Sequence, residues 1–378
     1  MRYYSIEFQN PNGGFPSGIP SVFTSHQQGI YNPACPEIEF DIANVYADAV
    51  ITPTHLRIHN VPLDLVKKSR QYNGMNVTFK AGFKSAVPGL KAQLPLENPL
   101  QAGIIAQGVV QTCYGNWLGT DLVLDFIIWP NGSLGSSNTI RSFNTGTNSP
   151  EAYQFLWEKG SLTDAIQKTV SDMGIKTVSG NINTTLANPP KEPIRNYVTT
   201  FASFSKYIQA NSVLWVEPPS QEKDGKGIYQ PYLGVRMGFK GNELVLYDGT
   251  ESVRTVELKY EEFIGQPTWV TDSGIVQSVH PLRNDIWLGY TIQYPKQTPT
   301  IVAPQYAPVL KEYNINESSA PLIVMQIRHV GKYRGATATS WCTYVNAGSA
   351  VRINPNNPNA GVPQSKVKTF GYEYTPTA

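Results

Sequence analysis

Apolar and polar residues alternate along much of the chain, which predicts a protein built mainly from β-strands. In "MNVTFKAGF", residues 75–83, every second residue is apolar, and the residues between them are Asn, Thr, Lys and Gly. Similar alternation predicts strands at residues 38–42, 56–61 and 152–157. In "DLVLDFIIW", residues 121–129, apolar residues instead occupy both faces. A strand that is apolar on both faces needs cover on both sides.

Residues 161–174 carry the clearest helix pattern in the chain. Ser161 suits the N-cap position, and Asp164 lies three residues later, in the capping-box position. Mostly apolar residues follow at three- and four-residue spacing until Gly174, which is a typical residue just past a helix end. A second helix is predicted over residues 201–212, with a strand following at 213–217. This part of the chain therefore predicts a small α+β module.

The C-terminal third returns to strands and turns. Residues 274–295 predict two strands joined by a turn at "PLRND", the second strand running from Ile286 to Tyr294. Residues 321–347 predict a hairpin, with its turn in "GKYRG". The last thirty residues are rich in Pro and Asn and predict an arm or tail.

These patterns divide the chain into four parts. We predict a first β unit at 1–150, the α+β module at 151–225, a second β unit at 226–347 and the arm at 348–378. A length of 378 residues is ample for two or three domains.

Composition and charge narrow the function classes. Charged residues make up 15% of the chain, below the ~25% of an ordinary soluble domain. The 31 Gly and 29 Pro are spread along the sequence, which is typical of a turn-rich β protein. A formal net charge of +2 gives no electrostatic reason to expect binding to nucleic acid or an anionic membrane.

The cysteines predict unpaired thiols. Cys35, Cys113 and Cys342 are odd in number, far apart and without metal-binding spacing. The start "MRYYSIEF" lacks the pattern of a signal peptide, and no apolar run approaches the ~20 residues of a membrane span. We therefore expect a protein that is made and kept in a cytoplasm until it is assembled, with no membrane insertion.

Histidines offer two weak candidate sites. His55 and His59 are four residues apart in a predicted strand, where that spacing places them about 13 Å apart on one face, too far for one metal. His280, His329 and Cys342 could in principle supply a nucleophilic site, but no nucleophile elbow is present and Cys342 falls within a strand. We expect no metal site and no nucleophile here.

Carboxylates and aromatics leave one alternative open. The pairs Glu261/Glu262 and Asp121/Asp125 are ordinary candidates for glycoside hydrolysis, which the sequence alone does not exclude. Four of the seven tryptophans fall at alternating strand positions, which favours core or interface over a ligand platform. These four are Trp129, Trp157, Trp287 and Trp341. No phosphate-binding or dinucleotide-binding glycine motif occurs, so we expect no cofactor and no enzyme activity.

Four stretches resemble one protein family in order and spacing. They are "NVTFKAGF" with "GIIAQGVV" and "GTDLVLDFIIWPNG", then "FLWEKGSLTDAIQKTVSDMGIK", then "EEFIGQPTWVTDSGIVQSVHPLRNDIWLGYTIQYP", and finally "IRHVGKYRGATATSWCTYVNA". Together they span about residues 56–347 and resemble the baseplate hub proteins of contractile-tailed bacteriophages, the tail protein D family.

The resemblance implies a fold, a location and partners. It implies a mainly β chain with a small α+β module and two tail-tube-like β-barrel domains. It further implies a homotrimer in the virion tail baseplate, placing six barrels around a channel for the genome. The partners would be the central spike protein, the tail tube protein and other baseplate proteins, with DNA present only in transit. Two alternatives remain: a polysaccharide-binding or polysaccharide-degrading β protein of a tail fibre, and a hub-like component of a related contractile injection system.

The two-faced strand 121–129 then predicts interface residues. We expect Val123, Ile127 and Trp129 to be covered only in the oligomer. We expect the alternate residues to be covered within the single chain; these are Leu122, Leu124, Phe126 and Ile128.

Overall fold

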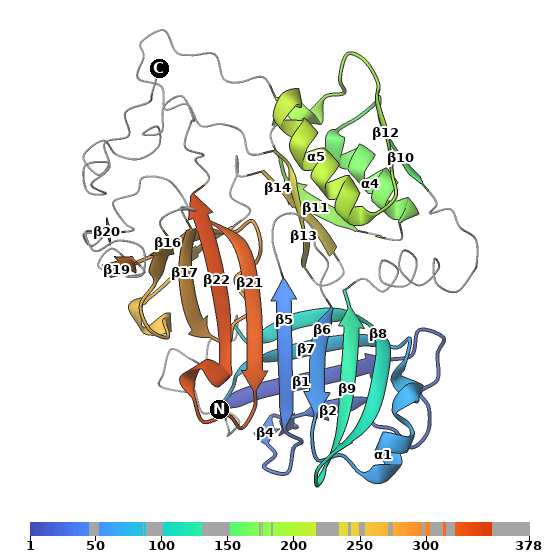
Figure 1. Cartoon of the computed structure of the whole chain (residues 1–378), viewed down its shortest axis with the longest axis vertical. Helices are drawn as coiled ribbons and strands as arrows, with labels where there is room; N and C mark the ends of the chain where they lie inside the picture. The colour runs from blue at the N-terminus through green and yellow to red at the C-terminus, as the bar shows by residue number, and fades with distance from the viewer. Residues whose placement is uncertain are drawn as a thin grey trace.

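Strands dominate the computed structural model, as Figure 1 shows. The structure describes residues 1–44, 53–85, 87, 101–130, 152–173, 175, 177–182, 184–216, 234–240, 243–248, 254–270, 275–295, 299–302, 313–314 and 322–349. Within these residues no helix is long and apolar enough to cross a membrane.

The described residues of the N-terminal β unit form nine strands and two short helical turns. They are β1 (Arg2–Gln9), β2 (Val22–Thr24), β3 (His26–Gln27), β4 (Ile30–Tyr31), β5 (Ile38–Asn44), β6 (Thr54–Ile58), α1 (Leu63–Lys67), η1 (Ser69–Tyr72), β7 (Asn76–Phe83), β8 (Gly103–Leu118) and β9 (Asp121–Trp129).

The remaining elements form the α+β module and the C-terminal β unit. The module contains β10 (Tyr153–Trp157), α4 (Leu162–Asp172), β11 (Val178–Asn181), η2 (Thr184–Ala187), β12 (Ile194–Val198), α5 (Phe201–Trp215), β13 (Arg236–Lys240) and β14 (Glu243–Tyr247). The C-terminal unit contains β15 (Thr255–Glu257), η3 (Tyr260–Glu262), β16 (Thr268–Val270), β17 (Ile275–Pro281), β18 (Thr291–Gln293), β19 (Pro299–Val302), β20 (Tyr313–Asn314), β21 (Leu322–Lys332), η5 (Ala338–Ser340) and β22 (Trp341–Ser349).

One sheet runs through both β units. Its strand order is β2-β1-β7-β8-β9-β6-β5-β21-β22-β17-β16-β19-β20, with β18 also paired to β21. The two units join where β5 pairs antiparallel with β21, from Asn44 opposite Ile327 to Glu39 opposite Lys332. Strands almost 290 residues apart in sequence thus lie side by side (Figure 1).

The N-terminal unit is a sheet folded over its own core. The first half of β8 pairs with β7 and its second half with β9, and a bulge between Val110 and Thr112 interrupts the β8–β9 register. Bulges bend strands, and here β1 and β7 cross behind β5, β6 and β9 (Figure 1). Within the described residues the backbone ladder does not close into a barrel.

Side chains link the N-terminal strands β1 and β7 to the β21–β22 hairpin, with which they share no backbone ladder. The Arg2 guanidinium donates hydrogen bonds to the carbonyls of Lys332, Tyr333 and Gly335 at 2.7–2.8 Å. Trp341 Nε1 donates to Gly82 O at 3.0 Å, so β22 is also tied to β7. An arginine that is hydrogen-bonded to several carbonyls holds the β21–β22 turn against the N-terminal strand.

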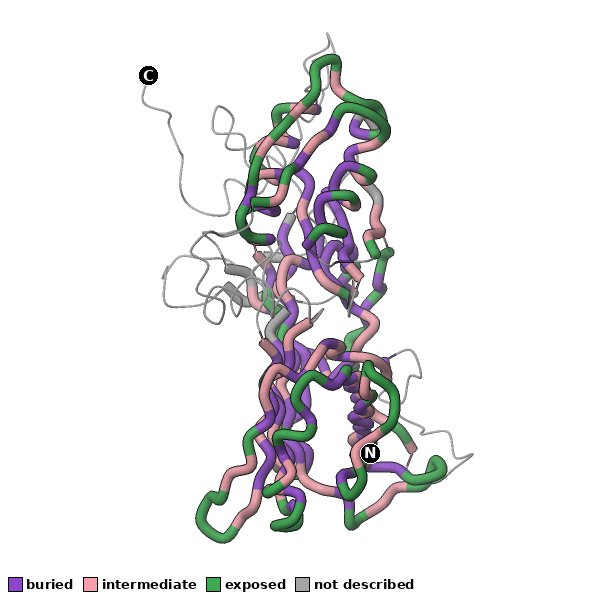
Figure 2. Tube along the Cα trace, turned by 90° about the vertical axis from the view of Figure 1, so that its right-hand side faces the viewer, coloured by how far each residue is buried: buried purple, intermediate pink, exposed green. Residues whose placement is uncertain are grey.

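The β21–β22 hairpin contributes to two cores. Its turn end places Tyr333 and Trp341 in the first core, with strands β1 to β9. Its other end places Val324 and Val345 in a second core, formed with β17, β18 and residues 286–294. Buried segments accordingly run along the middle of the molecule in Figure 2.

The α+β module has a third core of its own. Ser161 and Asp164 form the predicted capping box of α4, which confirms that helix. Val235, directly before β13, and Leu244 of β14 pack in this same core. Tyr247 of β14 instead lies in the second core, which joins the module to the C-terminal unit.

Several local predictions are confirmed and three are wrong. Met75, Val77, Phe79 and Ala81 share a buried face of β7, as the alternation predicts. Residues 213–215 continue helix α5 instead of starting a strand. The strand predicted for Ile286–Tyr294 is reduced to β18, because Gly289 adopts a φ of +80° and turns the backbone.

The third wrong prediction concerns the end of the strand predicted at residues 56–61. Strand β6 stops at Ile58, and Asn60 adopts a φ of +56° that directs the chain into α1. The predicted arm at 348–378 falls almost wholly outside the described residues.

The β5–β21 junction requires a glycine at position 331. A Cβ atom there would lie 2.0 Å from Cε1 of Phe40, its cross-strand partner. The Phe40 ring cannot easily move, because it packs edge-on against Phe79 and Trp341 with centroids 4.9 and 5.0 Å away.

We predict that Gly331→Ala lowers the free energy of unfolding by about 1–3 kcal/mol, the usual cost of overpacking a core. Denaturant unfolding measures this value. In a Phe40→Leu background the same substitution should cost clearly less, because the clashing ring is gone. Equal costs in both backgrounds would contradict this account of the junction.

Candidate functional site

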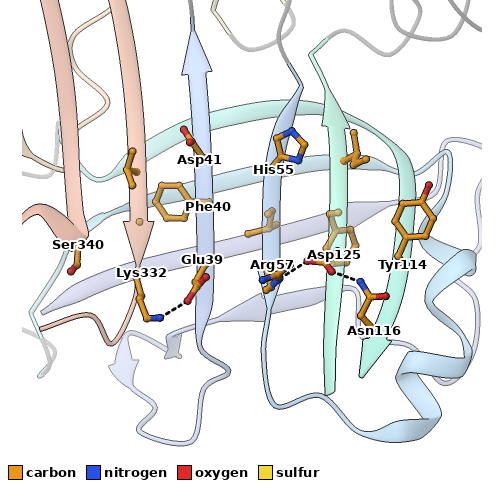
Figure 3. A pocket seen from close by; sticks show the side chains of 15 residues that line it. Glu39, Phe40, Asp41, His55, Arg57, Tyr114, Asn116, Asp125, Lys332 and Ser340 are labelled. Atoms are coloured by element: carbon orange, nitrogen blue, oxygen red, sulfur yellow. Dashed lines mark hydrogen bonds and ion pairs between the residues drawn. The ribbon is translucent and has the colours of Figure 1, made fainter. Parts of the chain in front are cut away.

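The outward face of the junction sheet carries a row of charged residues, which we call the ladder face. Cross-strand register aligns Lys332 of β21, Glu39 of β5, Arg57 of β6, Asp125 of β9 and Tyr114 of β8. Figure 3 shows these side chains rising from neighbouring strands on the side away from the first core. The register therefore alternates positive and negative charge across the sheet.

The charges of the ladder face are paired within the chain. Lys332 Nζ lies 2.6 Å from Glu39 Oε1, and Arg57 Nε lies 2.5 Å from Asp125 Oδ1. Asn116 donates to the second carboxylate oxygen of Asp125. Although burial alone would raise the pKa of the Glu39 carboxyl, the hydrogen bond and charge of Lys332 hold it below its usual value.

A third ion pair lies along the same face. Arg328 Nε donates to Asp41 Oδ1 at 2.8 Å, and its NH2 group donates to Oδ2, which makes the pair bidentate. The hydrogen bonds that Arg328 donates to Asp41 raise the pKa of the Arg328 guanidinium. These pairs are partly exposed, so each adds little to stability. As a result, the charges named here on the ladder face are each paired within the part of the chain that the structure describes.

An open groove of about 550 Å³ lies along the ladder face. Phe40, Leu56 and Phe126 lie beneath the groove, but their side chains pack in the first core and are at most 4% exposed, so they give its base backbone and not apolar side chains. Ile127 lines the groove as well, and Tyr114 is 52% exposed beside it. The groove thus combines apolar surface with mutually neutralised charges.

The candidate carboxylates on β9 have structural partners. Asp121 Oδ2 lies 2.6 Å from His59 Nδ1, and Asp125 is bound by Arg57. Asp121 and Asp125 are four residues apart on one strand face, which separates them by about 13 Å, beyond the ~5–9.5 Å of glycosidase pairs. The arrangement does not match a glycoside-hydrolysing pair.

The histidine pair is also separated. His55 is exposed on β6, whereas His59 lies beyond the strand end and contacts Asp121 and, at 3.7 Å, Glu39. Among the residues that the structure describes, no three His, Cys, Asp or Glu side chains gather as a metal site would require.

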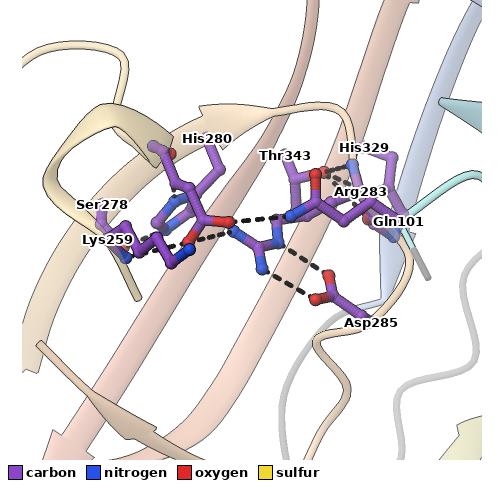
Figure 4. A network of polar contacts seen from close by, with 9 residues as sticks. Gln101, Lys259, Ser278, His280, Arg283, Asp285, His329 and Thr343 are labelled. Carbon is purple, nitrogen blue, oxygen red and sulfur yellow. Dashed lines mark hydrogen bonds and ion pairs between the residues drawn. The ribbon is translucent and has the colours of Figure 1, made fainter. Parts of the chain in front are cut away.

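Figure 4 shows a buried polar network around Arg283. Glu262 belongs to this network through Arg283 and Gln101. Arg283 forms two 2.7 Å hydrogen bonds with Asp285, and its NH1 lies 3.4 Å from Glu262. Gln101 Nε2 donates to Glu262 at 2.9 Å, which links the start of β8 to the C-terminal unit. Glu261, the other member of that candidate pair, is exposed.

His280, His329 and Cys342 are brought near one another but not into a catalytic arrangement. Thr343 lies between the two histidines in the β17-β22-β21 register, so its neighbour Cys342 points to the opposite face. Cys342 Sγ contacts Thr339 O, and burial raises the pKa of this thiol. Cys35, Cys113 and Cys342 are all free and buried, which confirms the prediction of unpaired thiols.

The three predicted interface residues differ in how far they are buried in the single chain. Val123 is fully buried in the single chain, so the expectation that only an oligomer covers it is wrong. The chain after β6 lies against this end of β9, with Val61 N–H donating to Leu122 O. Ile127 and Trp129 are half-buried, and their coverage by a neighbour stays a prediction.

The residues predicted to be covered within the chain mostly are. Leu124, Phe126 and Ile128 are at most 1% exposed and pack in the first core, whereas Leu122 is half-buried against it.

The sequence analysis did not identify the ladder face. Its charges fall at the polar positions of strands that alternate, where a solvated face is the ordinary expectation. The signal that could have found them is opposite charge at positions that pair across strands, and reading it requires the β5–β21 register. That register joins residues nearly 290 positions apart.

The buried histidines predict an acid-sensitive stability. Burial lowers the pKa of His280 to about 3 and that of His329 to about 4, from a usual value near 6.5. His280 Nδ1 donates to Glu262 O, and Nε2 faces Ser278 Oγ at 2.8 Å, an arrangement suited to the neutral ring.

We predict that the free energy of unfolding is fully retained above pH 6.5 and falls as the pH drops from 6.5 towards 4, because the unfolded chain binds protons that the folded chain refuses. Each histidine contributes up to about 1.4 kcal/mol per pH unit in this window. Denaturant unfolding of wild type, His280→Gln and His329→Gln between pH 5 and 7 measures it. A slope unchanged in both variants would contradict the assignment.

Comparisons with known proteins give matches only among solved structures. No protein-family model matches the chain, and no curated protein does. A 43 kDa tail protein of prophage MuSo2 from Shewanella oneidensis is 8% identical with a TM-score of 0.44, and the match covers 95% of this chain and 98% of that one. A tail protein from Neisseria meningitidis MC58 is 10% identical with a TM-score of 0.44, and the match covers 95% of this chain and 99% of that one. A Francisella PdpA-VgrG complex is 8% identical with a TM-score of 0.40, and the match covers 94% of this chain and 59% of that one. At these TM-scores the likeness carries no argument about function.

Proposed function

We propose that the chain is a structural baseplate hub subunit of a contractile phage tail. It forms a homotrimer that joins the tail tube to the central spike around a channel for the genome. The resemblance of residues 56–347 to hub proteins motivates this function. The structural observation that supports it best is the β5–β21 junction, which makes one connected sheet from the two β units of each chain.

Two connected β units per chain suit a subunit that adapts a six-fold tube to a three-fold spike. Three copies present six units, all reusing one kind of contact. Each unit is an open counterpart of a tube-like barrel. Arg2 and Trp341 supply side-chain links between the N-terminal strands and the β21–β22 hairpin.

A non-catalytic role is supported by the engagement of the candidate groups. Asp121, Asp125 and Glu262 each bind a histidine or arginine of the same chain. His280 and His329 are fully buried. No metal, cofactor or membrane contact is needed for the proposed role, and a net charge of +2 suits a channel that DNA only passes through.

The experiment is mass photometry of the purified chain over a concentration series, together with cryo-EM of tail particles. We predict a particle of three chain masses, and density for the chain between tube and spike. A chain that stays monomeric at high concentration and is absent from tails would contradict the proposal. A gene neighbourhood of injection-system components without a capsid would instead favour the related contractile injection system.

A second candidate function is binding of a polysaccharide at the groove. The observation that favours it is the exposed ring of Tyr114 beside Asn116, Asp125 and Arg57, since an aromatic ring with planar polar groups is a common chemistry for sugars. If so, glycan-array binding would be lost in Tyr114→Ala but kept in Tyr197→Ala, which removes a tyrosine of β12 that is also exposed. The hub proposal predicts no glycan signal and no release of reducing sugar from either variant.

A further inference from the structure

The tip of the β8–β9 hairpin exposes apolar side chains. Trp117 is 71% exposed and Leu118 is 47% exposed, directly before the turn at Gly119. The tip sequence from Asn116 to Thr120 carries no charged residue. Large apolar side chains exposed together at one protrusion are typical of a surface that another protein covers.

Within one copy the tip cannot reach the ladder-face groove. Tyr114 and Asn116 line the groove, so they point to the outward face of β8. Trp117 points to the other face, because it lies opposite Leu122, which packs against the first core. The side chain of Trp117 therefore faces away from its own groove, and only the groove of a second copy is accessible to it.

The chemistry of the groove matches an uncharged apolar tip. The groove holds about 550 Å³, and the apolar side chains that line it on the ladder face are Ile127 and Val330, with the ring of Tyr114 beside them. The ion pairs Arg57–Asp125 and Lys332–Glu39 are already formed, so covering them leaves no charge without a partner. Breaking or stranding a buried charge is costly, whereas covering a completed pair in a good geometry costs less. A highly charged ligand would find no unbalanced charge here.

We propose that the β8–β9 tip of one copy inserts into the ladder-face groove of the next copy. The tip and the groove are different surfaces, so the contact is heterologous and closes a ring when the rotation between copies suits it. The proposal rests on the homotrimer of the proposed function and specifies its contact. Trp117 is the anchor, in keeping with the enrichment of tryptophan at interface hot spots.

Site-directed crosslinking tests this contact directly. The doubly substituted protein Leu118→Cys/His55→Cys places one thiol on the tip and one beside the groove, where His55 is exposed. The three native thiols are buried and stay unreactive in the folded chain. With a short bis-maleimide we expect covalent dimers and trimers. The matched control Leu214→Cys/His55→Cys, with its first thiol at the 79% exposed position of α5, should give neither.

A truncation at the anchor gives an independent measurement. Trp117→Ala should raise the concentration for half-dissociation of the trimer by about 30-fold, the effect of losing one hot-spot side chain. Leu214→Ala, also an exposed apolar residue, should leave assembly unchanged. The thermal unfolding of Trp117→Ala below the assembly concentration should equal that of wild type, because the side chain is mostly exposed in one copy.

The outcomes separate this inference from the proposed function. A wild-type trimer with no tip-to-groove crosslink, or with unchanged assembly in Trp117→Ala, overturns the inference and leaves the hub proposal standing. A wild-type chain that never forms a trimer overturns both. Glycan binding that depends on Tyr114, together with assembly that is unaffected by Trp117→Ala, assigns the groove to a saccharide and also overturns the inference.

Discussion

The pairing of β5 with β21 is the constraint on which the rest of the structure depends. It aligns the N-terminal and C-terminal β units in one sheet and creates the register of the ladder face. The β21–β22 hairpin then serves two cores at once, with Trp341 in the first and Val345 in the second. At this junction the Phe40 ring occupies the space that a side chain at position 331 would need, so the glycine there allows the two β units to pair.

The same junction determines how the charges of the ladder face are paired. Lys332 and Arg328 of β21 pair with Glu39 and Asp41 of β5 across the junction, so the ladder face offers shape and apolar area instead of a charged field. Such a face suits contact with a protein better than capture of an ion or nucleic acid. The exposed Trp117 at the end of β8 supplies an apolar surface of matching character. These two features support the structural role in an assembly that we propose.

The sequence predicts local structure well and long-range structure poorly. Alternation over 75–83 and the capping box at Ser161 depend on near neighbours, and both predictions are confirmed. The turn at Gly289 and the burial of Val123 depend on how distant segments pack, which periodicity does not encode. The ladder face is invisible for the same reason, since Glu39 meets Lys332 only after the two β units join. The roles of His59 and Arg283 likewise come from partners that the fold supplies.

Native-state hydrogen exchange at the junction tests the central claim most directly. The amides of β5 and β21 that pair between Glu39–Lys332 and Asn44–Ile327 report whether the two β units open together. If the junction unites them, both strands exchange with the same free energy, equal to that of global unfolding. The contrary result would be β5 amides that exchange only through global unfolding while β21 amides exchange through an opening of much lower free energy. That result would contradict a single connected body.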